Sequence, residues 1–448
     1  MTPDRTTRPA PAAPRPLALP GFERHRLPNG LRLEFAERRD IPEVSLRLVL
    51  ENGAGAEPPS RAGLAELTAR LLTAGTPNRD AMDVARWLDR LGAGYHATAG
   101  YSVGTVSMHF LTEVFEEALD FLAATVLDSD FPEREVDRLR AERLDEIERQ
   151  GDDPATVANL ATIAELYGDG LYGRSMAGTS DTVAEISRDA VREFHEARFR
   201  PSESLLIVCG DVAPERLGPA VEARFGAWSG HAARVEPPPP PSAPESEVIL
   251  IDRPGSPQTE IRVATIGVPY GTGDHHAIIV ANAILGGLFN SRINLNLRED
   301  KGWTYGARTG FRFRRGAGPF VARTAVETAR TGPAFEEILR EIEAMCTQQV
   351  TPEEMKLARN ALTLSLPLQF ETAAQICGKV SRQRIFDLPD DYWETYRGRI
   401  DAVTPDQVRE VCRKYLDRDR LTLLAVGDAA AAGPTLGGLG AVDVRSIA

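Results

Sequence analysis

Two side chains near the middle of the chain, Arg298 and Tyr305, have the chemistry needed to hold a peptide backbone. They belong to the stretch LGGLFNSRINLNLREDKGWTYGA, residues 285–307. An arginine fork and a tyrosine hydroxyl are both strong hydrogen-bond donors, and a peptide carbonyl is an acceptor. A surface arginine and a half-buried tyrosine on an ordinary connection would show the same spacing, so the rest of the chain has to decide between the two interpretations.

The elements around these two residues can bring them into one cleft. The stretch opens with Gly286–Gly287, which we expect to be flexible and able to approach a substrate backbone closely. A short amphipathic helix carrying Arg298 follows, and it ends in a turn at Gly302. Aromatic and β-branched residues then predict a strand over Trp303–Phe313, with Tyr305 near its start. A helix-turn-strand unit of this length can fold back on itself, so both donors can face the same space.

Composition excludes several classes of function. The chain has 448 residues, which predicts two to four domains. Its net charge of −13 would repel a phosphate backbone over most of the surface, so we expect no nucleic-acid partner. No apolar run reaches the roughly 18 residues of a membrane span, so we expect no membrane partner.

The cysteines and the N-terminal segment favour a cytoplasmic location. The four cysteines show no CxxC pairing and sit inside apolar segments, which predicts reduced core residues. Residues 1–20 are rich in Pro, Ala and Arg and lack a continuous apolar core, which is typical of a disordered tail and not of a secretory signal.

The sequence contains an internal duplication. A predicted helix and an apolar strand end in Gly210–Asp211, and the same arrangement ends in Gly427–Asp428, 217 residues later (427 minus 210). The triplets Val191–Arg192–Glu193 and Val408–Arg409–Glu410 keep that offset. Between the copies, PPPPPSAPES predicts a stiff, extended connector. The expected division is a tail over 1–20, a first domain over 21–228, a linker over 229–247, a second domain over 248–430 and a C-terminal tail over 431–448.

Each copy repeats one order of elements. A strand is followed by helices, then by a pair of strands and then by long helices, the pattern expected of an α+β fold. We therefore predict two homologous halves, each an antiparallel-dominated β-sheet covered by helices on one side. In the first half, helices are predicted over 81–91 and 132–150, and the mixed-charge run 133–148 is interpreted as the solvated side of its helix.

Several blocks occur in an order that resembles the pitrilysin/insulinase family of inverted-zincin metallopeptidases. They are LPNGLRL, GLAELTARLLTAGT, LYGRSMAGTSDTVAEIS, the two strands that end in Gly-Asp, and SRINLNLREDKGWTYG. The resemblance covers nearly all of residues 27–426 and implies the two-domain fold of that family. In the family, an H-x-x-E-H helix and a later glutamate hold a catalytic zinc ion, and an Arg/Tyr pair helps to hold substrate.

The zinc motif is degenerate in this chain. The helix GLAELTARLLTAGT, residues 63–76, has Glu66, Ala69 and Arg70 at the three chemical positions, and Glu146 corresponds to the downstream glutamate. The seven histidines show no ligand spacing elsewhere, so we assign no metal to this chain. Glu66 and Arg70 are four residues apart in the order that favours a helical ion pair. We hypothesise that this pair, joined by Glu146, fills the space of the metal; two unrelated solvated side chains are the alternative.

The resemblance implies a division of labour between two subunits. A chain without the zinc ligands but with the Arg/Tyr pair looks like the non-zinc subunit of a heterodimeric peptidase. Its partner would carry H-x-x-E-H and zinc, and Arg298 and Tyr305 would stabilise the transition state of a bound peptide. Alone, this chain is expected to be zinc-free and inactive. The alternative is a catalytically inactive scaffold or peptide-binding protein of the same fold.

Overall fold

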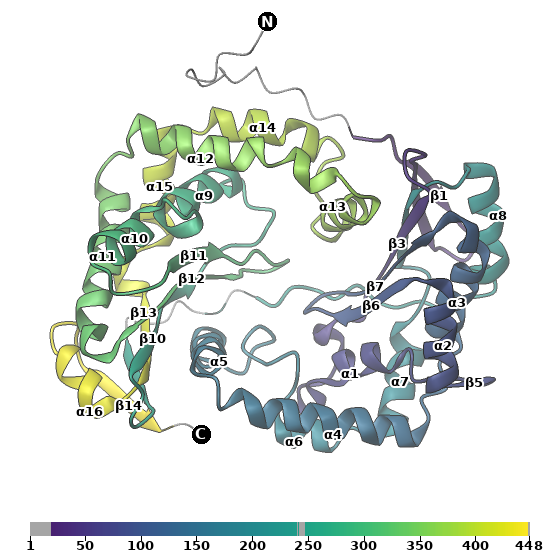
Figure 1. Ribbon diagram of the computed structural model, residues 1–448, viewed down its shortest axis with the longest axis horizontal. Helices are drawn as coiled ribbons and strands as arrows, with labels where there is room; N and C mark the ends of the chain where they lie inside the picture. The colour runs from purple at the N-terminus through teal and green to yellow at the C-terminus, as the bar shows by residue number, and fades with distance from the viewer. Residues whose placement is uncertain (1–18, 240, 242–246, 447–448) are drawn as a thin grey trace, which may run out of the picture.

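Two six-stranded sheets with the same strand order form the framework of the protein in the computed structural model, which describes residues 19–239, 241 and 247–446 (Figure 1). The first has the order β1-β2-β8-β3-β7-β6. Its strands are Glu23–Arg26 (β1), Arg32–Glu37 (β2), Glu43–Leu50 (β3), Gly94–Ala99 (β6), Gly104–Leu111 (β7) and Leu205–Gly210 (β8). Among the described strands of this sheet, only the neighbours β2 and β8 are parallel. The other neighbouring strands are antiparallel.

The second sheet has the order β11-β12-β10-β13-β9-β14. Its strands are Val248–Asp252 (β9), Gln258–Ile266 (β10), Ala307–Phe311 (β11), Pro319–Glu327 (β12), Thr422–Gly427 (β13) and Val442–Ser446 (β14). Strand β9 is parallel to both β13 and β14. The duplication is confirmed, because β8 and β13 are offset by the same 217 residues as the two Gly-Asp pairs.

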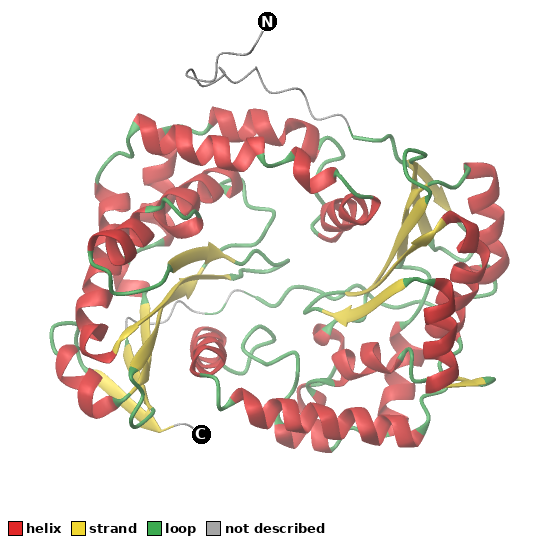
Figure 2. Cartoon of the chain, in the orientation of Figure 1, coloured by secondary structure: helices red, strands yellow, loops and turns green. Residues whose placement is uncertain are grey.

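Helices cover the outer face of each sheet, and the strands lie toward the middle of the molecule (Figure 2). The first half contains Leu64–Leu71 (α1), Ala81–Leu91 (α2), Phe115–Leu127 (α3), Glu133–Gln150 (α4), Ser180–Ala184 (α6), Arg188–Arg198 (α7) and Pro214–Phe225 (α8). The second contains His275–Asn282 (α9), Arg292–Asn294 (α10), Thr331–Thr347 (α11), Pro352–Leu364 (α12), Tyr392–Ala402 (α14), Pro405–Tyr415 (α15) and Ala429–Ala432 (α16). The predicted α+β class with two homologous halves is confirmed.

Each half also sends one helix onto the inner face of the other half's sheet. Helix α13, Ala373–Ile385, belongs to the second half and packs Ile376, Cys377 and Val380 against β3 and β8 of the first. Helix α5, Pro154–Tyr167, belongs to the first half and packs Ala158 against β9 and β13 of the second. The central strands β8 and β13 are consequently buried at all six positions, as strands covered on both faces are. The predicted one-sided covering is therefore incomplete.

The hairpin between β11 and β12 fixes one half against the other. Its Arg314 guanidinium lies over the rings of Tyr101 and Tyr172 in the first half, 4.1 and 4.4 Å from their centroids. The next residue, Arg315, forms an ion pair with Glu51 of the first half at 2.6 Å. Cation–π contacts and an enclosed ion pair both resist separation of the parts that they join.

One predicted domain boundary needs correction. The sequence predicts a tail over residues 431–448, but Val442–Ser446 forms the edge strand β14 of the second sheet. Within the predicted connector, Val235 is buried and its backbone N–H donates to Glu51 at 2.9 Å. Residues 240 and 242–246 of the connector, and residues 1–18 of the predicted tail, lie outside the described residues.

One apolar helical run passes through the core of the second half. In the described part of the chain, only 275–300 is long and apolar enough to cross a membrane by length and composition. Ile278, Ile284 and Leu297 of this run are buried in the second core. Packing inside the protein therefore accounts for its apolar character.

Candidate functional site

Four charged side chains fill the crossing of helices α1 and α4. Arg70 donates to Glu66 at 2.9 Å and makes two hydrogen bonds of 3.1 Å to the carboxylate of Glu146. Arg143, one turn before Glu146, pairs with Glu66 and lies 2.9 Å from Glu146. Hydrogen bonding from Arg70 lowers the pKa of Glu146 below its usual value. The hypothesis of an ion pair joined by Glu146 is confirmed, and the interpretation as unrelated solvated side chains is wrong.

This donor set does not fit a zinc ion. Zinc sites in proteins are built from imidazole, thiolate and carboxylate groups. Here the two carboxylates, Glu66 and Glu146, are each neutralised by the guanidinium groups of Arg70 and Arg143. The position corresponding to the general base holds the buried methyl group of Ala69. Among the described residues, no group of three or more His, Cys, Asp and Glu side chains is placed to bind a metal.

The residue at the start of helix α1, Gly63, has no side chain with which to cap it. Gly63 has φ of +98°, where a Cβ would be strained and would lie 2.8 Å from the carbonyl oxygen of Ala177. The carboxylate of Glu57 instead accepts the backbone N–H groups of Gly63 and Ala65 at 3.1 and 2.7 Å. Desolvation raises the pKa of Glu57 to about 7. These contacts fix the orientation of the helix that carries Glu66 and Arg70.

Arg298 lies in the π-helical turn Leu295–Asp300 (η5), the end of the predicted amphipathic helix. Its guanidinium lies 4.3 Å from the ring centroid of Phe289, and its Nε is 3.6 Å from a carboxylate oxygen of Glu299. The side chain is about one-third exposed. The guanidinium is thus positioned by an aromatic surface and keeps donors that can reach a ligand.

Tyr305 does not lie on a strand, which corrects the prediction. Strand β11 begins at Ala307, and Tyr305 occupies the turn before it, with 94% of its surface exposed. An aromatic ring this exposed gains almost nothing from packing within the described part of the chain. Tyr305 borders a hollow of about 420 Å³ that is also lined by Glu260, Arg308 and Arg323.

Hydrogen bonds hold the turn that contains Tyr305, although the Tyr305 ring itself is exposed. The Thr304 hydroxyl donates to the carbonyl of Gly306 at 3.0 Å, and the Thr324 hydroxyl donates to the same carbonyl at 3.1 Å. Asn294 accepts the N–H of Ala307 and donates to the carbonyl of Phe289, at 2.9 and 2.6 Å. Asn294 thereby ties the segment before Arg298 to the segment after Tyr305.

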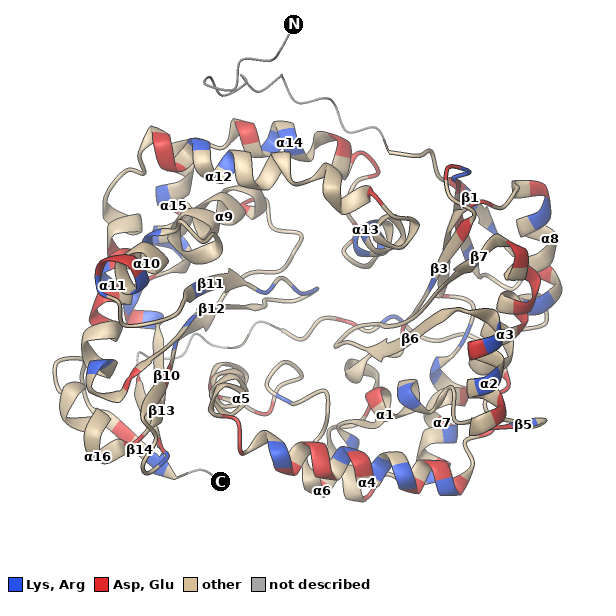
Figure 3. Cartoon of the chain, viewed as in Figure 1, with Lys and Arg blue, Asp and Glu red and all other residues tan. Residues whose placement is uncertain are grey.

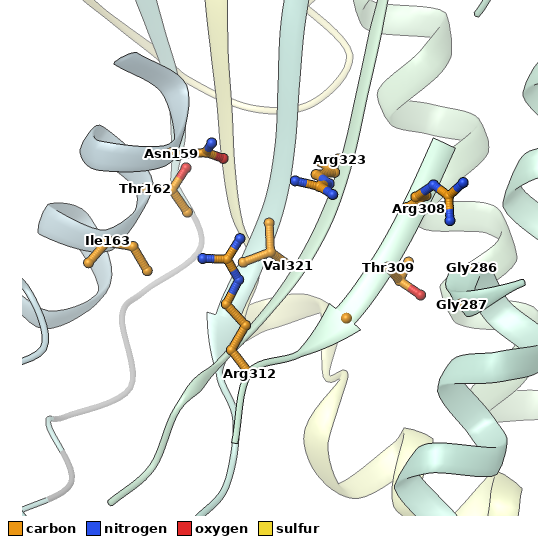
Figure 4. Close-up of a pocket in the computed structure, with 11 residues that line it drawn as sticks. Asn159, Thr162, Ile163, Gly286, Gly287, Arg308, Thr309, Arg312, Val321 and Arg323 are labelled. Carbon is orange, nitrogen blue, oxygen red and sulfur yellow. The ribbon is translucent and has the colours of Figure 1, made fainter. Parts of the chain in front are cut away.

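Gly286 and Gly287 serve close packing in this structure. They end the π-helical turn Ala283–Gly287 (η4), and a Cβ on Gly286 would lie 2.5 Å from the Thr309 side chain. A Cβ on Gly287 would meet the side-chain amide of Asn282 at 2.7 Å. The expected flexibility is not needed to explain either glycine, since each permits η4 to approach β11 or its own preceding helix. Both glycines also border a second hollow, of about 170 Å³ (Figure 4).

Sequence reasoning missed Arg143. The charge pattern of 133–148 predicts the solvated side of a helix, yet Arg143 is only 7% exposed. Its spacing from Glu146 is i,i+3, so the two side chains share a helical face. That spacing was the available signal, but it was hidden by the many other charges that Figure 3 shows along α4.

Comparison with known proteins identifies related sequences over most of the chain. Residues 35–180 match the family described as insulinase (peptidase family M16), and residues 185–362 match the family described as peptidase M16 inactive domain. An uncharacterized zinc protease of Mycobacterium leprae is 24% identical over 89% of this chain and 90% of its own. The mitochondrial-processing peptidase subunit beta of Bos taurus is 23% identical, over 90% of this chain and 83% of its own.

Solved structures show the same fold. A peptidase M16 inactive domain from Pseudomonas fluorescens superposes with a TM-score of 0.85, at 24% identity, over 91% of this chain and 98% of the other. A protease from Helicobacter pylori gives a TM-score of 0.84 at 15% identity, over 91% of this chain and 100% of its own.

Proposed function

Because the chain belongs to the insulinase family of peptidases, M16, we propose that it is the non-zinc subunit of a heterodimeric zinc peptidase. The observation that carries the proposal is the replacement of a metal-binding set by the Glu66–Arg70–Arg143–Glu146 network, while Tyr305 remains exposed on a rigid turn. The partner is a homologous subunit with an intact H-x-x-E-H helix, and zinc belongs to that partner. One similar protein, the mitochondrial-processing peptidase subunit beta, is by its name a subunit of a larger enzyme.

In this proposal Arg298 and Tyr305 act on the peptide bound opposite the partner's zinc. The guanidinium and the phenol donate hydrogen bonds to the scissile carbonyl, whose oxygen becomes negative in the transition state. A preorganised donor aimed at such an oxygen contributes roughly 100-fold to 1000-fold in rate. The cation–π contact with Phe289 and the hydrogen bonds around Thr304 support the proposal, since they hold the backbone and the guanidinium before substrate arrives.

In this proposal the isolated chain binds no zinc, is inactive and is located in the cytoplasm. The four cysteines are free, and Cys209, Cys377 and Cys412 are buried, which suits a reducing compartment. The peptide substrate and a homologous subunit are the expected partners.

The test uses the native complex, recovered by co-purification and then reconstituted from separate subunits. Arg298→Ala and Tyr305→Phe are each expected to lower kcat/KM for peptide cleavage roughly 100-fold to 1000-fold. Arg340→Ala is the matched control, because Arg340 is an exposed arginine of the same half whose ion pair, among the described residues, is with Glu337 on its own helix. Unchanged turnover in both variants, or stoichiometric zinc and chelator-sensitive cleavage in the isolated chain, contradicts the proposal.

A scaffold function is the second candidate. The enclosed Arg315–Glu51 pair and the exchanged helices α5 and α13 favour it, because they make a rigid body suited to holding a partner. A scaffold predicts that Arg298 and Tyr305 can be replaced without loss of activity in the complex, so the same variants separate the two functions.

A further inference from the structure

Three arginines stand directly opposite one another on adjacent strands of the second sheet. Arg323 of β12 is paired in register with Arg308 of β11 on one side and with Arg262 of β10 on the other. Like charges directly opposite in an antiparallel pair destabilise a sheet. This arrangement therefore costs stability unless other groups compensate the charges.

Among the described residues, a carboxylate compensates only one of these three charges. Arg262 is 2% exposed and binds Glu260 at 2.8 Å, the side-chain oxygen of Asn159 at 3.0 Å and the Ala155 carbonyl at 3.1 Å. Arg308 and Arg323 are exposed, and neither forms an ion pair with a carboxylate in the described part of the chain. The same holds for Arg312, two residues past Gly310 on the edge that carries Arg308. We call Arg308, Arg312 and Arg323 the arginine row.

The arginine row borders both hollows between the second sheet and helix α5. All three residues line the hollow of about 170 Å³, with Asn159 and Thr162 of α5 on its other side (Figure 4). Arg308 and Arg323 also line the hollow of about 420 Å³ that Tyr305 borders. Shared walls make the two hollows neighbours along one track that starts at Tyr305. The charge is local, since the whole chain has a net charge of −13.

Guanidinium groups bind carboxylates with two parallel hydrogen bonds, and unpaired ones on a groove wall are suited to an anionic ligand. Desolvation, together with the neighbouring charges of Arg323 and Arg314, lowers the pKa of Arg312, as expected where positive groups crowd without counter-charge. Two adjoining hollows, one of them bordered by Tyr305, favour an extended peptide over a single small anion.

We propose that the arginine row binds the carboxylates of an acidic peptide whose neighbouring backbone reaches Tyr305. The carboxylates are acidic side chains of the peptide or its C-terminal group. An acidic peptide is thus the chemical class of substrate for the proposed function. Binding of the peptide does not depend on that function; only its being a substrate rests on the proposed function.

The test measures binding to the isolated full-length chain, so it does not depend on a partner or on cleavage. Fluorescence anisotropy would follow a dye-labelled decapeptide with four glutamates, the same peptide with glutamines, and each of them with a C-terminal amide. The glutamate peptide is expected to bind at least about tenfold more tightly than the glutamine peptide, and the difference should shrink with added salt. An effect of the amide alone would assign the row to the peptide C-terminus.

Variants of the arginine row test whether these arginines are responsible for the binding. Arg308→Ala with Arg323→Ala is expected to abolish the preference for glutamate, while Arg192→Ala, an exposed arginine of α7 in the first half, should preserve it. The double variant should keep or raise the Tm, because a repulsion across the strands is removed, and so loss of binding is not a folding defect. Arg323→Glu also lowers the charge of the row from +3 to +1, so it should weaken binding of the glutamate peptide about as much as the double variant does. Equal binding of the glutamate and glutamine peptides together with no effect of the C-terminal amide, or a preference that survives the double variant, overturns the inference. Normal peptide binding with no effect of Arg298→Ala on cleavage by the complex would refute the proposed function alone.

Discussion

Arg315 of the second half and Glu51 of the first form a two-pronged ion pair, with nitrogen–oxygen distances of 2.6 and 2.8 Å, that is almost closed to solvent. Glu51 also accepts the N–H of Val235, and Arg315 donates to the carbonyls of Val235 and Ile385. One pair thus joins both sheets, the connector and helix α13. Removal of this ion pair should therefore lower the stability of both halves of the protein.

Glu51→Gln is expected to lower the free energy of unfolding by about 3–5 kcal/mol, because it leaves the Arg315 charge buried without its counter-charge. Urea unfolding measures the change. Arg138→Ala, in an exposed pair on α4, is the control and should cost less than about 1 kcal/mol. The double variant Glu51→Leu, Arg315→Met should be less destabilised than the two single variants added together; strict additivity would show that the two side chains do not act as a pair.

The network between α1 and α4 gives a second prediction. Arg143→Met should destabilise the first half by about 1–3 kcal/mol, because Glu66 and Glu146 lose the buried one of their two arginine partners and keep only the more exposed Arg70. Arg70→Met should cost less, since Arg70 is about one-third exposed and Arg143 still bridges the carboxylates. Thermal unfolding of the two variants gives the comparison, and a larger loss for Arg70→Met would contradict this account of the network.

Acid should destabilise the second half through two buried histidines. His275 lies in an aromatic cluster, 4.4 Å from the ring centroids of Tyr270 and Phe313, and burial lowers its pKa to about 3. Burial also lowers the pKa of His276 to about 4. Below pH 6.5 the unfolded chain takes up protons at these positions and the folded chain does not, so stability falls as the pH falls from about 6.5 toward 4.

His275→Phe should flatten this dependence. We expect the free energy of unfolding lost between pH 7 and pH 5 to be smaller by about 2 kcal/mol than in the native chain. The range stops at pH 5 so that most carboxylates stay ionised, and the opposite contribution of Glu57 is common to both proteins. His96→Gln, which changes an exposed histidine, should leave the slope unaltered. The same slope in His275→Phe and the native chain would count against the burial of an uncharged His275.

Thiol labelling should report contact between the halves. Cys377 of α13 is buried against the first half, where its Sγ donates to the Ser45 carbonyl at 3.4 Å, and burial raises its pKa. Because the thiolate is the reactive form, Cys377 should resist alkylation in the native chain. In Glu51→Gln, mass spectrometry should find faster labelling of Cys377 but not of Cys412, which is buried within the second half. Equal acceleration at both sites would indicate global unfolding instead.

Local sequence signals predicted helices and strands well where the hydrophobic pattern agreed with the positions of turn and capping residues. Helix α2 has the predicted bounds 81–91, and the offset of 217 residues located both β8 and β13. The i,i+4 spacing of Glu66 and Arg70 predicted their ion pair. Each of these features depends on residues close together in the chain or on repetition of a pattern.

Features that depend on distant contacts were not predictable in this way. The aromatic content of Trp303–Phe313 predicted a strand through Tyr305, but Thr324 of the neighbouring strand holds Gly306 in a turn instead. The covering of each sheet by a helix from the other half, and the register that aligns Arg262, Arg323 and Arg308, both arise from tertiary pairing. Neither leaves a pattern in a single stretch of sequence.

The reciprocal placement of α5 and α13 means that the chain is interlaced as well as linked. A protease cut in the proline-rich connector would leave two fragments that stay associated, because each contributes a helix that packs on the sheet of the other. We therefore expect a nicked molecule to travel as one particle in gel filtration, and two separately encoded pieces to reassemble when they are produced together.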